Sequence, residues 1–348
     1  MQALATLLTL DVAAALPSVA VFRFGEQPGY VAMREPALLL LPAAAGSPPT
    51  LLAVAEAGQN HLLRDGSWPT AGCDIVSKTS TDGGATWSAL NVVLKNASQP
   101  SPVFDANRST IVMNANGAPH CMDSARVGSA GCGFNIQLVS TDRGASWSAP
   151  TPIDRFLGPK YDHAAAGHGG LQLFTGPHAG RLLFIGHRGA VRAAAPAARA
   201  APAAPADAPP QYVEDAVWYS DDGGKTYKVS KQTMAKMDEA QLVQNNDGAI
   251  IANMRWRGSP REGRGIATST DSGATFSAVT YDPMLKTVVC QASVFRSPQN
   301  GEIYYSAPAS FPSTKRVGGS IRRSKTGRPS SWEPRALTVN NMTTAFGK

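Results

Sequence analysis

Four aspartates recur in one short pattern and are the first residues to consider for chemistry. The pattern reads Ser-x-Asp-x-Gly-x-Thr/Ser-aromatic, and its carboxylates are Asp82, Asp142, Asp222 and Asp271. An Asp followed two residues later by Gly is typical of a turn, because the carboxylate accepts hydrogen bonds from backbone amides and Gly adopts a positive φ. The pattern therefore favours a structural role over catalysis for these carboxylates, with each aromatic residue folded beneath its own turn.

The spacing of the histidines argues against metal chemistry. The six histidines show no His-Glu-x-x-His motif and no paired ligand spacing, so we predict no catalytic metal and no cofactor.

The net charge of +7 comes from a chain with only 16% charged residues, and its one dense basic cluster is STKRVGGSIRRSKTGR. Such a short cluster favours a local site for an acidic ligand, whereas a nucleic-acid groove needs a longer basic stripe. We therefore predict no nucleic-acid partner.

Short strands with alternating polarity separate the copies of the repeated pattern. Segments such as TLLAVAEA, STIVMNAN, RLLFIGHR, AIIANMRW and EIYYSAP have the period of two that is typical of half-buried strands. The pattern returns about every 50 to 60 residues once one insertion is discounted, and such a period predicts the blades of a β-propeller. We therefore expect an all-β fold that fills one domain over residues 1–348.

The insertion lies at about residues 190–210 and reads AVRAAAPAARAAPAAPADAPP. Its bias towards Ala and Pro predicts a disordered or loosely helical surface loop inside one blade. It does not mark a boundary between domains.

The compartment stays open at this stage. No apolar run is long enough to cross a bilayer, and the N-terminal segment lacks the basic start of a signal peptide and contains Asp11. Cys121 and Cys132 are close enough in sequence to close a small disulfide loop. Glycosylation motifs at Asn96, Asn107 and Asn341 favour a secreted or lysosomal protein over a cytoplasmic one.

The repeated pattern and three further segments resemble the Asp-box propellers, and among them the sialidases of the glycoside hydrolase 33 type. The first segment, YVAMREPALLLL, is similar to the Arg-x-Pro element of that family and implies that Arg34 is the first arginine of its triad. The second, MDEAQLVQNNDGAIIANMRWRG, implies roles for Glu239 and Arg255, and the third, YYSAPASFPSTKRVGGSIRRS, implies one for Arg316. The resemblance extends from about residue 20 to about residue 335. It implies a six-bladed propeller.

The substrate of such an enzyme explains why three arginines are needed. A sialic acid carries a carboxylate on its anomeric carbon, and the planar arginine fork binds a carboxylate in a bidentate manner. Arginines from three distant blades meet only near the axis of a propeller. We therefore expect Arg34, Arg255 and Arg316 to converge at the end opposite the Asp turns, with Arg322 and Arg323 solvated in the next strand.

The family resemblance also implies the catalytic groups. Sialidases use a tyrosine nucleophile that a neighbouring Glu activates, and Glu239 matches that Glu. An acid/base carboxyl is also required. We assign it to Asp65, with Asp74 as the alternative, because the family places this Asp in a loop about a dozen residues before the first Asp turn.

Two departures from the family pattern affect this prediction. No tyrosine follows Tyr305 in the sequence, so the nucleophile is not identified and the last blade is expected to be incomplete. Glu35 stands between Arg34 and Pro36, where it places a charge beside the arginine triad. A pairing of Arg34 with Glu35 or Glu26 is the simpler alternative to substrate binding, although adjacent strand residues point to opposite faces.

Together these features predict an exo-α-sialidase that removes terminal α-linked sialic acids from glycoproteins, gangliosides and oligosaccharides, with retention of configuration. We expect a monomer. Because no tyrosine follows Tyr305, we expect this chain to hydrolyse sialosides poorly. A propeller that binds sialic acid or a protein without catalysis is the alternative.

Overall fold

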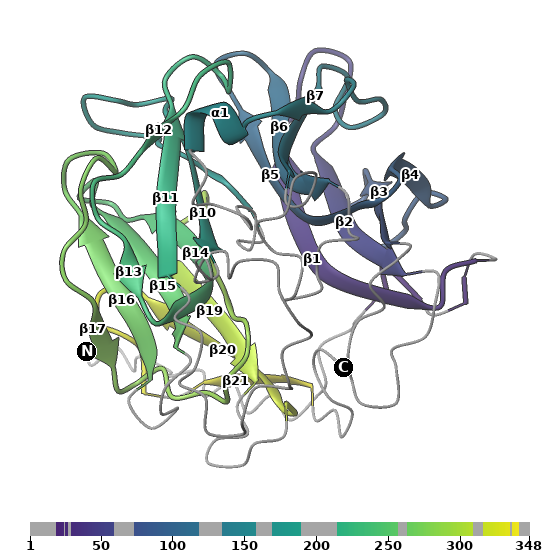
Figure 1. Cartoon of the computed structure of the whole chain (residues 1–348). Coiled ribbons are helices and arrows are strands. Elements are labelled where there is room, and N and C mark those ends of the chain that lie inside the picture. The colour runs from purple at the N-terminus through teal and green to yellow at the C-terminus, as the bar shows by residue number, and fades with distance from the viewer. Residues whose placement is uncertain are drawn as a thin grey trace, which may run out of the picture.

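Strands dominate the computed structural model, which describes residues 19–23, 25, 26, 29–58, 73–117, 134–157, 169–188, 214–256, 263–308, 316–334 and 336–340. They form five antiparallel sheets, which we number as blades in chain order (Figure 1).

Blade 1 has β1 (Ala32–Leu41), β2 (Thr50–Gly58), β3 (Cys73–Ser80) and β4 (Asn91–Leu94). Blade 2 has β5 (Ala97–Asp105), β6 (Thr110–Gly117), β7 (Phe134–Ser140) and β8 (Thr151–Pro152), followed by the helix α1 (Asp154–Leu157). Blade 3 has β9 (Leu171–Gln172), β10 (Leu182–Arg188), β11 (Glu214–Ser220), β12 (Lys228–Val229) and β13 (Met234–Ala235). Blade 4 has β14 (Met237–Gln244), β15 (Ile250–Trp256), β16 (Arg264–Ser269) and β17 (Thr280–Asp282). Blade 5 has β18 (Ser293–Arg296), β19 (Ile303–Pro308), β20 (Gly319–Ser324) and β21 (Leu337–Asn340).

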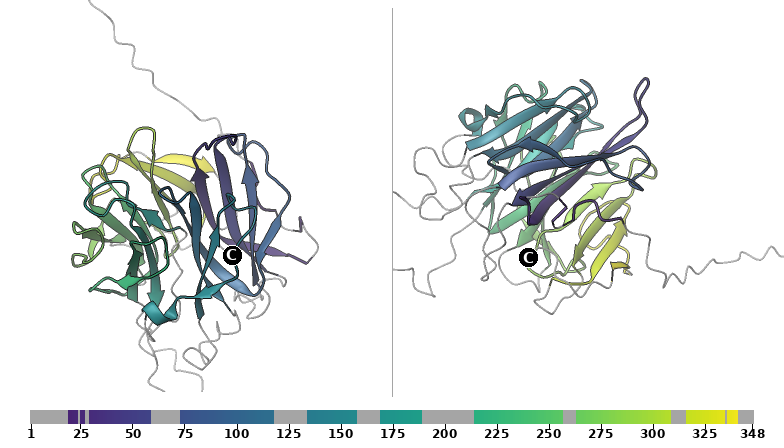
Figure 2. Two further views of the ribbon diagram at one scale, coloured as in Figure 1. Left: turned by 90° about the horizontal axis from the view of Figure 1, so that it is seen from above. Right: turned by 90° about the vertical axis from the view of Figure 1, so that its right-hand side faces the viewer.

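The blades follow one another around a common centre, as the two views in Figure 2 show. Each blade contacts the next through its first strands, from β1 with β5 to β14 with β18. This arrangement confirms the predicted all-β propeller. The prediction of six blades is wrong for the described residues, which form five, and the fifth blade has all four strands. That number came from the family resemblance, whereas the sequence itself carries only four clear copies of the repeat.

Apolar cores lie between the blades, because each strand alternates in side-chain direction and so presents one apolar face to each neighbouring blade. Leu52 and Val54 of blade 1 pack with Ile111 and Met113 of blade 2, for example. Further cores join blades 2 and 3, blades 3 and 4, and blades 4 and 5. Burial between blades therefore holds the propeller together.

The repeated pattern forms a turn between the third and fourth strands of blades 1 to 4, as predicted. In the last copy, Asp271 Oδ1 accepts the Ser269 hydroxyl at 2.8 Å and the Thr275 amide at 2.9 Å. The Ser269 hydroxyl oxygen in turn accepts the Gly273 amide at 2.9 Å. Equivalent bonds form at Asp82, Asp142 and Asp222. These bonds account for the carboxylates and give them the structural role predicted from the sequence.

The aromatic residues of the turns take two different positions. Trp87 folds beneath its own turn and donates from Nε1 to the Gly84 carbonyl at 3.1 Å. Tyr227 and Phe276 are instead buried in the cores towards the preceding blade. The predicted fold beneath the turn is therefore correct for Trp87, whereas these two aromatics join neighbouring blades.

In blades 2 to 4 the glycine of the turn packs against the preceding blade. A Cβ on Gly273 would lie 2.4 Å from Leu183 Cδ2 of blade 3, and one on Gly144 would lie 3.1 Å from Leu52 of blade 1. Both glycines have positive φ, 87° and 90°. Glycine is therefore required both by the backbone conformation and by the close approach of two blades.

A fifth, degenerate copy of the turn lies in blade 5 and was missed from the sequence. Ser324 accepts the Gly327 amide at 2.9 Å, while Thr326 stands where the other turns have Asp. Trp332 takes the place of the aromatic residue one position later and donates to Asp282 at 2.9 Å. Without the Asp, this copy did not match the pattern.

Several predictions fall outside the described residues: the Cys121–Cys132 pair, the insertion at 190–210, Asn341 and Asp65. In the part of the chain that the structure describes, no helix is long and apolar enough to span a membrane.

Candidate active site

Glu239 and Arg255 form an ion pair at one end of blade 4. Arg255 Nη1 lies 2.5 Å from Glu239 Oε2, and both side chains are largely buried, with 16% and 18% exposed. Glu239 is the third residue of β14, where a β-bulge between Asp238 and Ala240 interrupts the register with β15. A bulge re-aims a side chain, which explains why Glu239 reaches Arg255 although Asp238 is the residue opposite it.

Asp238 is a second carboxylate beside Arg255, and the sequence analysis did not single it out. Its Oδ2 lies 3.7 Å from Arg255 Nε, and its Oδ1 accepts the Glu239 amide at 2.8 Å. Burial opposes the charge of Arg255, but the carboxylates of Glu239 and Asp238 outweigh it and raise the pKa of Arg255 above its ordinary value. The only sequence signal for Asp238 is its place next to Glu239.

Arg316 approaches the same region from blade 5. It precedes β20 and donates from Nη2 to the Val289 carbonyl at 3.2 Å. The adjacent thiol of Cys290 is buried, and this burial raises the pKa of Cys290. The charges of Arg316, Glu239 and Arg255 all act on that thiol. Cys290 therefore marks the point where groups from blades 4 and 5 meet.

Arg34 occupies the position in blade 1 that Glu239 occupies in blade 4. It is the third residue of β1, as Glu239 is of β14, and it pairs in register with Glu56 of β2. Its Nη2 donates to Glu35 Oε1 at 3.1 Å, and its side chain is 28% exposed. The pairing with Glu35 therefore exists. The argument from strand alternation against it is wrong, because a bulge follows Arg34 and Glu35 has a φ of 50°.

All three arginines lie at the end of their blades opposite the Asp turns. In blade 4, Arg255 pairs in register with Asp238, whereas the far end of β15, Ile250, pairs with Ser269 at the start of the turn. Arg316 precedes β20, whose other end, Ser324, begins the degenerate turn. Among the described residues, Arg255 contacts Glu239 directly, while Arg316 contacts the Val289 carbonyl next to Cys290. The convergence of Arg34 with them stays a prediction.

The alternative acid/base residue, Asp74, has structural partners. It is 1% exposed, and its oxygens accept the Tyr30 hydroxyl at 2.6 Å and the Asn96 amide at 2.9 Å. The simpler interpretation of Asp74 as a structural residue thus agrees with its contacts. Asp65 lies outside the described residues, so its assignment stays a prediction.

The competing arginines of β20 have surface partners. Arg323 pairs with Glu333 at 2.6 Å and is 48% exposed, as expected for a solvated charge. Arg322 donates to the Glu333 and Pro334 carbonyls at 3.1 and 3.0 Å. Arg316 is therefore the arginine of this segment that lies next to Cys290.

Two further buried polar residues belong to the site region and were not predicted. Arg264 is 1% exposed and donates from Nε to Asn253 Oδ1 at 2.8 Å. Asn253 is 2% exposed and lies on β15 two residues before Arg255. From the sequence, Arg264 was indistinguishable from a surface charge, because it opens a strand next to a polar loop.

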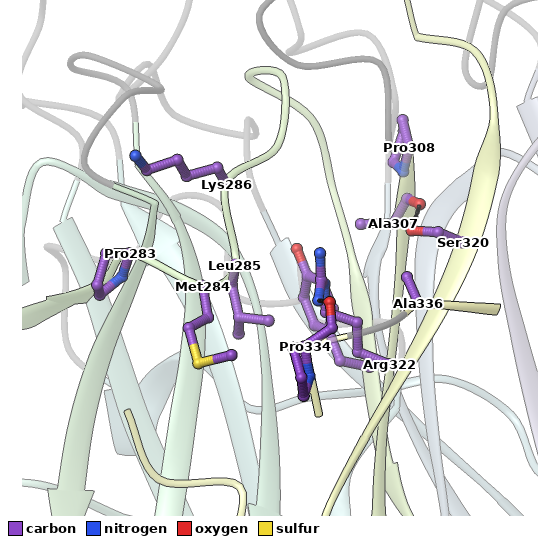
Figure 3. A pocket seen from close by; sticks show the side chains of 11 residues that line it. Pro283, Met284, Leu285, Lys286, Ala307, Pro308, Ser320, Arg322, Pro334 and Ala336 are labelled. Carbon is purple, nitrogen blue, oxygen red and sulfur yellow. Dashed lines mark hydrogen bonds between the residues drawn. The ribbon is translucent and has the colours of Figure 1, made fainter. Parts of the chain in front are cut away.

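A separate crevice of about 380 Å³ lies against blade 5, between residues 283–286, β19, β20 and residues 334–336. Figure 3 shows Leu285 and Arg322 beside it, while Lys286 points away from them. Tyr305 also lines it, and burial raises the pKa of Tyr305 to about 12. Neither Glu239 nor Arg255 lines this crevice, so it is distinct from the candidate site.

Comparison with known proteins gives consistent relatives. No family model matches the chain. A sialidase of Micromonospora viridifaciens is 31% identical over 244 residues, which cover 64% of this chain and 34% of that protein. A sialidase of Bacteroides fragilis strain YCH46 is 26% identical over 251 residues, or 64% of this chain and 40% of that protein. The chain thus spans between a third and two fifths of the length of these relatives.

The fold comparison agrees with the sequence comparison. The crystal structure of the NanB sialidase from Streptococcus pneumoniae superposes with a TM-score of 0.70 at 17% identity, covering 93% of this chain and 64% of the other. At that identity the superposition supports the fold alone. Taken with the relative at 31% identity, it shows that this chain is a homologue of the sialidases and folds as a β-propeller of their kind.

Proposed function

We propose that the protein is a sialidase-type glycoside hydrolase that removes terminal α-linked sialic acids from glycoconjugates with retention of configuration. The observation that carries the proposal is the Arg255–Glu239 ion pair, with Arg316 on the Val289 carbonyl next to Cys290, in a chain homologous to sialidases. These groups lie at the end of the blades opposite the Asp turns. A carboxylate ligand is the natural partner of convergent guanidinium groups.

Each residue has a distinct role in this proposal. Arg34, Arg255 and Arg316 would bind the substrate carboxylate. Asp65 would protonate the leaving glycosidic oxygen and later accept a proton from water. Glu239 would activate a tyrosine nucleophile, a choice that avoids the repulsion between an attacking carboxylate and the substrate carboxylate.

A propeller that binds sialic acid without cleaving it is the second candidate function. Among the described residues, the Glu239 carboxylate contacts Arg255 and has no tyrosine hydroxyl beside it. Tyr305 lies in the core between blades 4 and 5. The charged groups described here are of the kind that binds a carboxylate, whereas catalysis also needs a nucleophile next to Glu239.

We further propose that the complete propeller has six blades in a single domain that contains the insertion at about 190–210. Support comes from apolar side chains that stay exposed on blades 1 and 5, the first and last blades in chain order. Leu38 and Leu40 of β1 are 60% and 52% exposed, and Phe295 of β18 is 54% exposed. Phe295 also stacks on Tyr304, with ring centroids 5.6 Å apart. A further sheet between blades 5 and 1 would cover these side chains.

The test is to incubate the whole chain with a fluorogenic α-sialoside, to identify the released sugar and to measure sialoside binding by calorimetry. Arg255→Lys is the site variant, because lysine cannot bind a carboxylate in the bidentate manner of arginine. Arg323→Lys is the matched control, because Arg323 is exposed and pairs with Glu333 outside the candidate site. Release of sialic acid that Arg255→Lys abolishes supports the hydrolase. Binding without release, again lost in Arg255→Lys, supports the binding propeller. Neither release nor binding would rule out both.

A further inference from the structure

Arg264 is one of the most deeply buried charges near the candidate site, with the same exposed fraction as Asp238. It opens β16, is 1% exposed, and its pKa is lowered by burial. A buried charge is destabilising unless its surroundings compensate it. Among the described residues Arg264 forms no ion pair, and its hydrogen-bond acceptors are neutral oxygens. A guanidinium in this position therefore calls for an explanation beyond packing.

The acceptors of Arg264 come from three separate segments. Besides Asn253 Oδ1 on β15, Nη1 donates to the Cys290 carbonyl at 3.0 Å, in the connection between blades 4 and 5. Nη2 donates at 3.4 Å to the carbonyls of Glu239, on β14, and of Asn253. One side chain therefore ties two neighbouring strands to the segment that leads into blade 5.

Among the acceptors of Arg264, the Glu239 carbonyl bears directly on the candidate site, because the carboxylate of the same residue contacts Arg255. It lies at the bulge of β14, the position at which the strand leaves its regular register with β15. A bulge leaves the ladder locally disrupted. The bond from Arg264 therefore restrains the backbone of Glu239 where it is least supported, and with it the carboxylate that contacts Arg255.

The carbonyl of Cys290 is the second such acceptor. Arg316 donates to the carbonyl of Val289, so Arg264 and Arg316 bind adjacent carbonyls of one dipeptide from different blades. The dipeptide Val289–Cys290 thus links Arg264 to Arg316. Displacement of Arg264 would release both Glu239 and the segment on which Arg316 rests.

We propose that Arg264 is a positioning residue, which holds Glu239 at its bulge and, through Val289–Cys290, sets the place of Arg316. The inference deepens the proposed function and rests on it for the sugar, but the geometric part concerns this chain alone. Arginine suits the role because its planar fork offers donors in several directions at once. Lysine keeps the charge but cannot reach all three segments in the same way.

The test compares Arg264→Lys with Arg181→Lys in the whole chain. Arg181 is a matched control: it is 5% exposed, donates to Asp221 at 2.7 Å and to the Ser272 carbonyl at 2.8 Å, and joins blades 3 and 4 at the Asp-turn end. The first measurement is the alkylation rate of Cys290 in the native protein, read by peptide mass spectrometry. The second is the affinity and, where turnover occurs, the KM and kcat for an α-sialoside.

We expect Arg264→Lys to raise the alkylation rate of Cys290 at least about fivefold, because the thiol loses its anchored backbone and becomes accessible. We expect it to weaken sialoside binding or turnover about tenfold or more, since small misplacements of site groups have large effects. Arg181→Lys should leave both measurements within about twofold of wild type, even where it lowers the free energy of unfolding.

The result that overturns the proposal is an Arg264→Lys protein with unchanged Cys290 alkylation and unchanged sialoside affinity. A change in alkylation without any sialoside binding in wild type would uphold the positioning role and reject the proposed function. Should Arg264→Lys fail to fold, Asn253→Ser removes one acceptor and leaves the arginine in place. It must then raise the Cys290 alkylation rate, and an unchanged rate would reject the proposal.

Discussion

Arg255 shows at the scale of single residues how the candidate site balances its charges. Two carboxylates, Glu239 at 2.5 Å and Asp238 at 3.7 Å, flank one guanidinium that is largely buried. Their negative charge stabilises the arginine against desolvation and leaves it ionised for a substrate carboxylate. Removal of one carboxylate should therefore change both the charge and the orientation of Arg255.

The Glu239→Gln substitution keeps the size of the side chain and removes its charge. We expect it to lower the rate of α-sialoside hydrolysis about 10²-fold or more, the usual size of a lost general acid–base contribution. Glu333→Gln is the control, because Glu333 also pairs with an arginine, at 2.6 Å, but is 49% exposed. Equal losses in the two variants would contradict a specific role for Glu239.

The Asp turn is the recurring element of the molecule, and it has two structural functions. Its Asp and Ser organise the turn itself, while its Gly allows the preceding blade to approach. Blade 1 differs from the others, since a Cβ on Gly84 would meet only Leu51 of its own blade and Trp87 of its own turn, at 3.4 and 3.7 Å. The two functions can therefore be separated by comparing equivalent positions.

Gly273→Ala and Gly84→Ala form such a matched pair. Both glycines have positive φ, 87° and 93°, so both substitutions carry the same backbone strain. Only the Cβ on Gly273 would collide with the neighbouring blade, 2.4 Å from Leu183. We expect Gly273→Ala to lower the free energy of unfolding by about 1 kcal/mol or more beyond Gly84→Ala in urea denaturation, as overpacking does. Equal effects would argue against close contact between blades at this turn.

The Asp carboxylates of the turns should make stability depend on pH. At Asp271, hydrogen bonds from Thr275 and Ser269 lower the pKa even though burial, the largest influence, opposes them. A group with a lowered folded-state pKa stabilises the fold above its unfolded value, near 4, and loses that contribution as the pH falls through the folded value.

We therefore expect Asp271→Asn to lower the free energy of unfolding by about 1 kcal/mol at pH 7, the usual size of such hydrogen bonds. The difference from wild type should shrink as the pH falls below 4, where the carboxylate of the unfolded chain becomes protonated, and should vanish below the lowered pKa of the folded carboxylate. Urea denaturation of both proteins at pH 7 and below pH 4 measures this difference in the free energy of unfolding. A difference that grows in acid would show that the sign is wrong.

The whole molecule combines tightly packed contacts between successive blades with outer faces that stay exposed. Leu41 is fully buried between blades 1 and 2, whereas its neighbour Leu40 points to the opposite face and is 52% exposed. Alternation along β1 thus places adjacent leucines in two different environments. The proposed sixth blade would cover the face of β1 on which Leu40 lies, and not the face of Leu41.

The two leucines provide a direct measure of that exposure. We expect Leu41→Ala to lower the free energy of unfolding by about 2 to 5 kcal/mol, as for other buried leucines. Leu40→Ser should change it by less than about 0.5 kcal/mol, as for other surface positions. Chemical denaturation of both variants measures the difference. A large loss in Leu40→Ser would show that this face is already covered in the chain of 348 residues.

Local chemistry in the sequence was sufficient to predict the Asp turns, the alternating strands and the propeller. Each depends on residues a few positions apart, such as Asp271 and Gly273, or on a pattern of period two. Glu239 and Arg255, which the family resemblance singled out, also lie within one hairpin, but their ion pair was not predicted. The degenerate turn at Ser324 was missed because Thr326 replaces the Asp that defines the pattern.

The tertiary structure alone decided which residues share the site and in what environment. Arg264, Asp238 and Cys290 look like ordinary strand or loop residues in the sequence, and strand alternation argued against the pairing of Arg34 with Glu35, which was only the alternative. Bulges change the direction of side chains without a sequence marker, and burial of a charge depends on segments from different blades. Turn formation is a local equilibrium that neighbouring residues determine, whereas burial and convergence depend on contacts between residues far apart in the chain, which only the packed blades establish.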